Sequence, residues 1–319
     1  MEKIKKTVYP LEEILTRYFS DHFERLSRYD IPKVSRLRRE AMDFFNQNGF
    51  PHKKMENWRN TDMEGIYEKE LEVFDREIPF EKVLSEIFLC EVHGFETRVL
   101  SVLNGCFYSP EELKLTVDEN GVIVGSLAKA QQEYPELIEK YYGEIIQQED
   151  GFKALNTALA SDGVFIYVPD NVEVKNTIQL INILNKPNLM INVRNLIVLG
   201  KNAKLTFLHC DDSVNHHAGF INKVNEIYLG ENAELVLYKL QNLNDETALL
   251  NQTAIHQSVD SRLKVNVLSF NGGLIRNEIV DLLNGEGAWS DIRGLYVMDQ
   301  HQHIDNKLPP VSIFDSHEW

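Results

Sequence analysis

The segments NLIVLGKNAKLTFL, from Asn195 to Leu208, and NEIYLGENAELVLY, from Asn225 to Tyr238, carry one pattern at an offset of 30 residues. In each, an alternating apolar run leads into a glycine and asparagine turn, and a second alternating run follows. Strand side chains alternate faces, so each copy predicts strand, tight turn and strand with one apolar face. The apolar positions that correspond are Ile197 and Ile227, Leu199 and Leu229, Ala203 and Ala233, Leu205 and Leu235, and Phe207 and Leu237.

One such unit cannot bury its apolar face alone. A repeat at this fixed spacing therefore predicts stacked coils that share one core, which is a solenoid and not a doubly wound sheet. We expect Leu199 and Leu229 to lie in the same core. NEIVDLLNGEGAW, from Asn277 to Trp289, is a looser echo with one residue inserted before its glycine turn.

The first 160 residues have a different pattern from the repeats, because apolar residues recur there mostly at helical spacing. Two strand pairs interrupt them, with turns at Asn104–Gly105 and Asn120–Gly121. Short β-rich runs then continue from Val164 to about Val297. We expect a helical N-terminal domain with a few strands over 1–151, a β-helix core over 152–306 and a tail over 307–319. The expected helices are Leu11–Leu26, Val34–Asn48, Phe80–Phe88, Leu127–Gln148 with a break at Pro135, and Phe152–Ala160.

Composition narrows the function classes. Lys and Arg total 33 against 49 Asp and Glu, a formal charge of −16, which would repel a nucleic acid backbone. No run approaches the roughly 18 apolar residues that cross a bilayer, and the charged start has no signal-peptide core, so we expect a cytoplasmic protein without membrane partners. Three widely spaced cysteines fit reduced thiols.

Nucleotide-binding and hydrolase motifs are absent from the sequence. It contains no G-x-x-x-x-G-K-[ST] phosphate loop, no G-x-G-x-x-G fingerprint, no G-x-S-x-G elbow and no C-x-x-C pair. In the charged loop from Gly49 to Asp62, Glu56, Trp58 and Arg59 could form a ligand site. The simpler interpretation is that the indole anchors the loop on a helix pair.

Two stretches carry metal-ligand chemistry. HCDDSVNHH, from His209 to His217, gathers imidazoles, a thiol and carboxylates that suit iron or zinc. A strand continuing past Phe207 would place His209 and Asp211 on one face and Cys210 on the other, and a polar connecting loop is the simpler interpretation. HQHID places His301, His303 and Asp305 on one side of a strand, as a metal site or as a solvated edge.

Four segments together carry a more specific pattern. The first comprises Arg39, Ala41, Gly49, Phe50, Pro51, Glu56, Trp58, Arg59, Thr61 and Asp62. The second is VLNGCFYSPEEL, with Asn104 and Gly105. The third is FKALNTALASDGVFIYVPDNVEV, with Leu155, Asn156, Gly163, Val168 and Pro169, and the fourth consists of the LGxNAxL repeats. The combination resembles the SufB/SufD family of iron-sulfur cluster assembly proteins, and within it the SufD branch.

This resemblance implies a right-handed parallel β-helix flanked by helical segments. It also implies a non-enzymatic scaffold subunit that pairs with a SufB-like paralogue through the β-helix and with a SufC-like ATPase, which carries the phosphate loop. The complex would assemble iron-sulfur clusters and support iron delivery, and the resemblance implies no cofactor held by this chain alone. The matching residues of the four segments are expected to be structural.

One departure from the family lies at the end of the sequence. Family members continue through more coils and a helical region that binds the ATPase, whereas KLPPVSIFDSHEW, residues 307–319, does not align with them. We expect a truncation or a shifted reading frame here, which makes the ATPase contact the least supported part of the resemblance. An open last coil would expose unpaired strand edges.

A β-helix enzyme acting on acidic polysaccharide is the alternative function. It would need charged residues clustered on one outer face of the coils, although the strong negative charge of the chain disfavours a polyanion. The residues that could supply the cluster are Arg262, Arg276, Asp281, Asp291 and Arg293.

Overall fold

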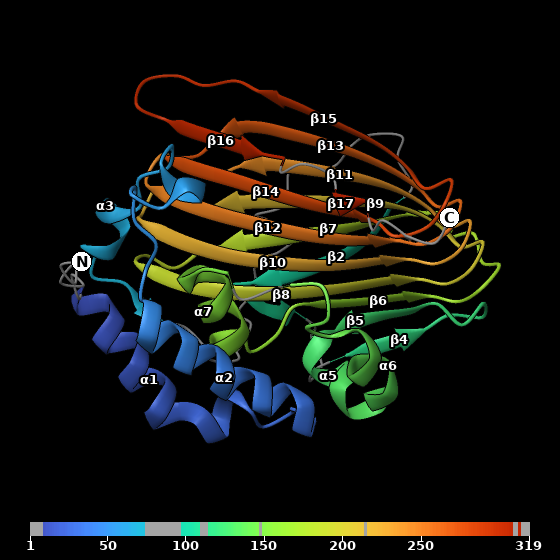
Figure 1. Ribbon diagram of the computed structural model, residues 1–319, viewed down its shortest axis with the longest axis horizontal. Helices are drawn as coiled ribbons and strands as arrows, with labels where there is room; N and C mark the ends of the chain where they lie inside the picture. Colours follow the sequence, from blue (N-terminus) through green and yellow to red (C-terminus); the bar gives the residue numbers. More distant parts are fainter. Residues whose placement is uncertain are drawn as a thin grey trace.

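The computed structural model describes residues 9–73, 97–108, 114–146, 149–213, 216–308 and 312–313. From β7 onward the chain alternates between two stacked sheets of parallel strands, A and B, and so forms a flattened solenoid of about five turns (Figure 1). Sheet A runs β16 (His303–Lys307), β14 (Leu274–Leu283), β12 (Thr247–Gln257), β10 (Gly219–Leu229), β8 (Leu189–Leu199), β6 (Val164–Val168), β5 (Ile123–Ser126) and β4 (Leu115–Val117); β1 (Glu72–Val73) pairs with β8 and β17 (Ser312–Ile313) with β14. Sheet B runs β15 (Trp289–Tyr296), β13 (Arg262–Asn271), β11 (Glu234–Asn242), β9 (Lys204–Ser213), β7 (Thr177–Leu184), β2 (Thr97–Leu103) and β3 (Cys106–Tyr108).

The two repeat copies are successive coils in register. Asn195 lies opposite Asn225, and Leu199 lies opposite Leu229, in the pairing of β8 with β10. Both leucines are 1% exposed and belong to one apolar cluster that fills the space between the sheets. The prediction of a solenoid with a shared core is therefore confirmed.

The glycine and asparagine turns have a stacking function. Asn202 and Asn232 adopt left-handed φ values of 56°, which asparagine tolerates better than most residues. The side chain of Asn232 donates to Asn202 Oδ1 at 2.8 Å, so the turns form a ladder along the solenoid. A Cβ on Gly230 would lie 2.8 Å from the carbonyl carbon of Gly200, so only glycine allows the coils to approach this closely.

The repeat spacing shortens along the chain. Asn225 pairs with Thr253, 28 residues later, and Asn251 pairs with Asn277, 26 residues later. In the coil at Thr253, Ser258 occupies the turn position that is glycine in the two repeat copies. The sequence pattern therefore did not identify this coil. The looser copy of the repeat at Asn277 belongs to the solenoid. However, Asp281, and not Ile279, lies opposite Ile255, which in turn lies opposite Ile227. That shift of two residues preserves the face that each side chain occupies.

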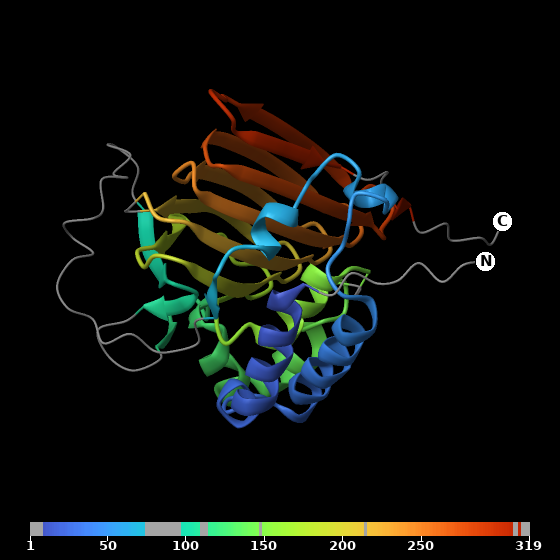
Figure 2. The same cartoon turned by 90° about the vertical axis from the view of Figure 1, so that its left-hand side faces the viewer.

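A layer of helices covers the outer face of sheet A (Figure 2). Apolar residues of α1, α2 and α7 pack on Met190, Phe220 and Leu250 of three successive strands. The helices at Leu11, Val34 and Phe152 are confirmed, as is the break at Pro135, but the helical stretch expected to reach Gln148 ends at Tyr141. The expected helix 80–88 lies outside the described residues. The helices are α1 (Pro10–Leu26), α2 (Pro32–Asn48), η1 (Glu56–Trp58), α3 (Glu64–Tyr67), α5 (Leu127–Glu133), α6 (Pro135–Tyr141) and α7 (Gly151–Leu159).

Buried polar contacts fix this layer on the solenoid. Arg194 of β8 pairs with Glu226 of β10 at 2.6 Å, and donates to Thr157 Oγ1 of α7 at 2.9 Å. Asn156 of α7 donates to the carbonyl oxygens of Val193 and Asn222, both at 2.9 Å. These bonds tie one helix to adjacent coils. Within the described ranges, no helix is long and apolar enough to cross a membrane.

Candidate functional site

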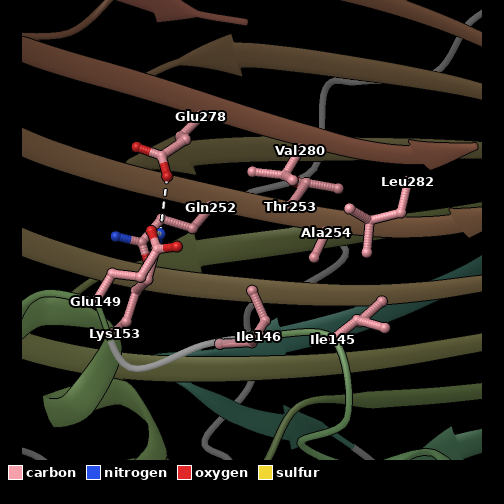
Figure 3. Close-up of a pocket in the computed structure, with 10 residues that line it drawn as sticks. All are labelled: Ile145, Ile146, Glu149, Lys153, Gln252, Thr253, Ala254, Glu278, Val280 and Leu282. Atoms are coloured by element: carbon pink, nitrogen blue, oxygen red, sulfur yellow. Dashed lines mark hydrogen bonds and ion pairs between the residues drawn. The ribbon is translucent and has the colours of Figure 1, made fainter. Parts of the chain in front are cut away.

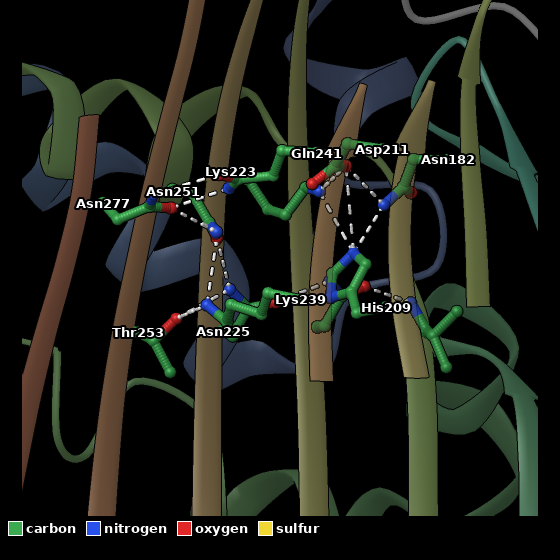
Figure 4. A network of polar contacts seen from close by, with 12 residues as sticks. Asn182, His209, Asp211, Lys223, Asn225, Lys239, Gln241, Asn251, Thr253 and Asn277 are labelled. Carbon is green, nitrogen blue, oxygen red and sulfur yellow. Dashed lines mark hydrogen bonds and ion pairs between the residues drawn. The ribbon is translucent and has the colours of Figure 1, made fainter. Parts of the chain in front are cut away.

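Polar side chains occupy part of the space between the sheets. On β9 the inward row Leu205 and Phe207 continues with His209 and Asp211, both 2% exposed. On β11 the corresponding inward row continues with Lys239 and Gln241. We call the group the inner polar cluster (Figure 4). Its members are Asn182, His209, Asp211, Lys223, Asn225, Lys239, Gln241, Asn251, Thr253 and Asn277.

His209 and Asp211 meet a lysine from the facing sheet. Lys223 of β10 forms an ion pair with Asp211 and lies 3.1 Å from His209 Nε2. Asn182 Nδ2 lies 3.0 Å from Asp211 Oδ1 and 2.6 Å from His209 Nε2. Burial lowers the pKa of His209 well below its usual range, and the Lys223 and Lys239 ammonium groups lower it further. The imidazole is therefore neutral at pH 7.

Lys239 is the second buried lysine of the cluster. Its Nζ donates to Thr253 Oγ1 and lies 3.4 Å from Asn251 Oδ1. Burial, reinforced by the charge of Lys223 and opposed by Asp211, lowers the pKa of Lys239 to about 7. Burial also lowers the pKa of Lys223, although Asp211 opposes that shift. The interior therefore holds one closely paired ammonium group and one that ionises near neutrality.

Amide side chains extend the cluster along the solenoid. Asn225 donates to Asn251 Oδ1 at 3.0 Å and to Thr253 Oγ1 at 3.1 Å. Asn251 donates to Asn277 Oδ1 at 3.0 Å, and Asn277 donates to Asn306 Oδ1 at 2.9 Å. This row of amides crosses successive coils and ends at β16. The strands are thus joined by side-chain bonds as well as by their backbones.

The last coil presents open strand edges. β15 ends sheet B and β16 ends sheet A, and no further described strand pairs with their outer sides. Apolar side chains are exposed on this coil, among them Leu295 and Val297, both 55% exposed. Exposed apolar side chains that lie together are typical of surfaces that contact another chain. We call β15, β16 and residues 297–302 the terminal coil.

Two family models match the chain. The SufBD protein N-terminal region matches residues 10–180, and the SUF system FeS cluster assembly SufBD core domain matches residues 182–309. The chain belongs to the SufBD family. The two matches cover the helical layer and the solenoid strands up to β16.

Relatives of the chain carry corresponding names. It is 26% identical over 283 residues to an iron-sulfur cluster assembly SufBD family protein of Synechocystis, covering 84% of this chain and 60% of that protein. It is 26% identical over 195 residues to the iron-sulfur cluster assembly protein SufD of Bacillus subtilis, covering 59% of this chain and 45% of that protein. The chain therefore spans about half the length of these curated relatives.

Residues of the first of the four segments that resemble the family lie at a helix end, in a turn and in the core. Gly49 caps α2 at φ 68°, and the Pro51 carbonyl accepts a bond from the Tyr67 hydroxyl at 2.7 Å. Trp58 is 2% exposed beneath the Arg276 guanidinium, whereas Glu56 and Arg59 are exposed and do not join it.

Residues of the second and third segments lie at junctions between helices, turns and coils. The side chain of Asn104 donates to Asn185 Oδ1 at 2.7 Å, and Gly105 adopts φ 90° in the β2–β3 turn. A Cβ on Gly163 would lie 1.8 Å from the Arg194 carbonyl oxygen. Leu155 is fully buried in α7, and Pro169 follows β6.

The stretch from His209 to His217 differs from its simpler interpretation. Residues 209–213 continue strand β9, so interpreting them as a polar loop was wrong. Cys210 faces away from His209, as the strand pattern predicts, and His216 and His217 are exposed. The solenoid accepts these polar groups because Lys223 of sheet A faces them across the core, while Lys239 lies beside His209 on the neighbouring strand of sheet B.

His301, His303 and Asp305 do not converge. His301 is exposed in a turn, and His303 begins β16 with its Nε2 buried. Asp305 bonds instead with Arg276 and Thr61. In the described ranges, no group of three or more His, Cys, Asp or Glu side chains is arranged to hold a metal ion.

The charged cluster required by the alternative polysaccharide enzyme does not assemble. Arg276 is buried on the outer face of sheet A, and Asp281 faces the interior, where Gln257 and Ser290 bond to it. Asp291 and Arg293 pair with each other on β15. Arg262 is exposed at the start of β13.

The two lysines of the inner polar cluster, Lys223 and Lys239, are among its members that escaped the sequence analysis. The alternating pattern contained a signal, because Leu235, Leu237, Lys239 and Gln241 all have the same parity. A lysine at an inward position of a repeat indicates either the end of the core or a buried partner.

Proposed function

We propose that this chain is a SufD-like scaffold subunit of the SUF system, working in iron-sulfur cluster assembly and iron delivery and performing no catalysis itself. The observation that carries the proposal is the match of the two SufBD family models over residues 10–180 and 182–309. The similarity to the Bacillus subtilis protein named SufD supports the branch. In this proposal the clusters are cargo of the complex in the cytoplasm.

The proposed partners are a SufB-like paralogue and a SufC-like ATPase. The exposed apolar side chains of the terminal coil suit the first of these, because strands of a related solenoid can pack on them. ATP hydrolysis would belong to the SufC-like subunit, in keeping with the lack of a phosphate loop in this sequence. Neither nucleic acid nor a membrane is expected as a partner.

Co-expression tests the proposal. The tagged chain is produced with SufB-like and SufC-like candidates from the same genome, and the proteins that remain bound through gel filtration are identified. A stable complex with the SufB-like protein is expected. The double variant Leu295→Lys/Val297→Lys should weaken it, because two charges then face the docking strands.

The matched control is Val259→Lys, which places a charge on an apolar side chain that is 44% exposed in a turn between β12 and β13. It should bind like the unchanged chain. Absence of any complex with a folded SufB-like protein would overturn the proposal. A complex that survives the double change would remove the terminal coil from it.

A further inference from the structure

A pocket of about 140 Å³ lies on the outer face of sheet A (Figure 3). Its floor consists of Ala254 of β12 with Val280 and Leu282 of β14. Ile145 and Ile146, from the segment between α6 and α7, form the facing wall. Five aliphatic side chains therefore surround most of the space.

The other end of the pocket is polar. Lys153 of α7 pairs there with Glu278 at 2.8 Å and with Glu149 at 3.0 Å, so these charges already have partners. Gln252 of β12 lies beside them (Figure 3). It is 4% exposed, and its Oε1 accepts no hydrogen bond from any described residue. A buried amide oxygen in a pocket wall is a site for a donor group.

The size and lining define the class of ligand. A cavity of about 150 Å³ lined by aliphatic side chains accommodates benzene. The carboxylates of Glu149 and Glu278 disfavour an anion. Together with Asp305 they carry three negative charges, and Lys153, Arg276 and Lys307 in the same ion-pair network carry three positive ones, so no unbalanced charge attracts a cation. A neutral ring with one donor matches both ends of the pocket.

We propose that this pocket binds a single ring-sized apolar group that carries one hydrogen-bond donor, such as a phenol or an indole. Its ring would pack on Ala254, Val280 and Ile146, and its O–H or N–H would donate to Gln252 Oε1. The group can come from a free small molecule or from a tyrosine or tryptophan side chain of another protein. This inference is independent of the proposed scaffold function.

Ligand-observed NMR on the full chain tests the proposal, with phenol and benzene as probes up to about 10 mM. Phenol should bind more tightly than benzene. Gln252→Leu should weaken phenol about three- to tenfold, the typical value of one hydrogen bond, and leave benzene unchanged. Val280→Phe places a ring in the pocket and should abolish the binding of both probes.

Val236→Phe is the matched control, because it enlarges a half-buried valine on the outer face of sheet B. It should bind both probes like the unchanged chain, and circular dichroism confirms that each variant folds. Equal affinity for phenol and benzene, survival of binding in Val280→Phe, or no binding by the folded chain would each overturn the proposal.

N-acetyltyrosinamide distinguishes the two sources of the ring. If it competes with phenol at the pocket with at least equal affinity, a side chain of another protein is the supported source. If phenol binds and the capped amino acid is excluded, a free small molecule is supported. Either result agrees with the proposed ligand class.

Discussion

Replacing Lys239 by methionine should stabilise the solenoid and reduce its dependence on pH. The lysine is 1% exposed, and its pKa falls from 10.5 to about 7 on folding, first through burial. Methionine fills a similar volume without a charge. The two oxygens that contact the ammonium group keep a donor, because Asn225 bonds to both Asn251 and Thr253.

The magnitude follows from proton linkage. The folded state binds the Lys239 proton more weakly than the unfolded state does, so unfolding takes up a proton between about pH 7 and pH 10.5. Stability therefore rises with pH across that window. At about 1.4 kcal/mol per pH unit, Lys239 adds about 2 kcal/mol between pH 7 and pH 9, and keeping it neutral at pH 7 costs at most about 4 to 5 kcal/mol.

Urea unfolding at pH 7 and pH 9 measures both effects. Lys239→Met should gain about 2 kcal/mol at pH 7, even if only half of the cost is realised, and should lose most of the rise toward pH 9. Lys264→Met, on an exposed position of β13, is the control and should change neither. An unchanged pH slope in Lys239→Met, or a loss above about 1 kcal/mol at pH 7, would refute the reasoning.

Three further tests examine the packing between coils and helices. Arg194→Met should cost about 3 to 5 kcal/mol, because it leaves Glu226 charged and buried, and adding Glu226→Leu should recover part of that loss in urea unfolding. Leu199→Ala and Leu229→Ala should each cost about 2 to 5 kcal/mol, with a coupling of at least about 0.5 kcal/mol in a double-mutant cycle; strict additivity would argue against their contact. Gly163→Ala should lower the melting temperature, since its Cβ would meet the Arg194 carbonyl oxygen, and an unchanged value would contradict that clash.

The fold could be predicted because its information is local and repeated. Leu199 and Leu229 recur at the same position in two coils, which indicates that they share one core. The glycine and asparagine turns indicate where each coil bends. The coil at Thr253 was missed because its turn contains Ser258, and because its spacing is 28 residues. A strict period fails once one loop shortens.

The inner polar cluster was harder to predict. His209 and Asp211 are polar like solvent-facing residues although they alternate in step with the buried Leu205 and Phe207. Nothing within β9 reveals that Lys223 lies on the opposite sheet. The same limitation applies to the pocket, which Ile146 and Val280 form from segments far apart in the sequence. Sequence patterns indicate which face a side chain takes, whereas the facing partner depends on the tertiary arrangement.

Hydrogen exchange in the complex with a SufB-like partner tests most directly whether this chain acts as a scaffold through its solenoid. The backbone amides of β15 and β16 should become protected when the partner binds, while those of α1 and α2 on the helical layer exchange as in the free chain. Protection confined to the helical layer, with the terminal coil unchanged, would contradict the account.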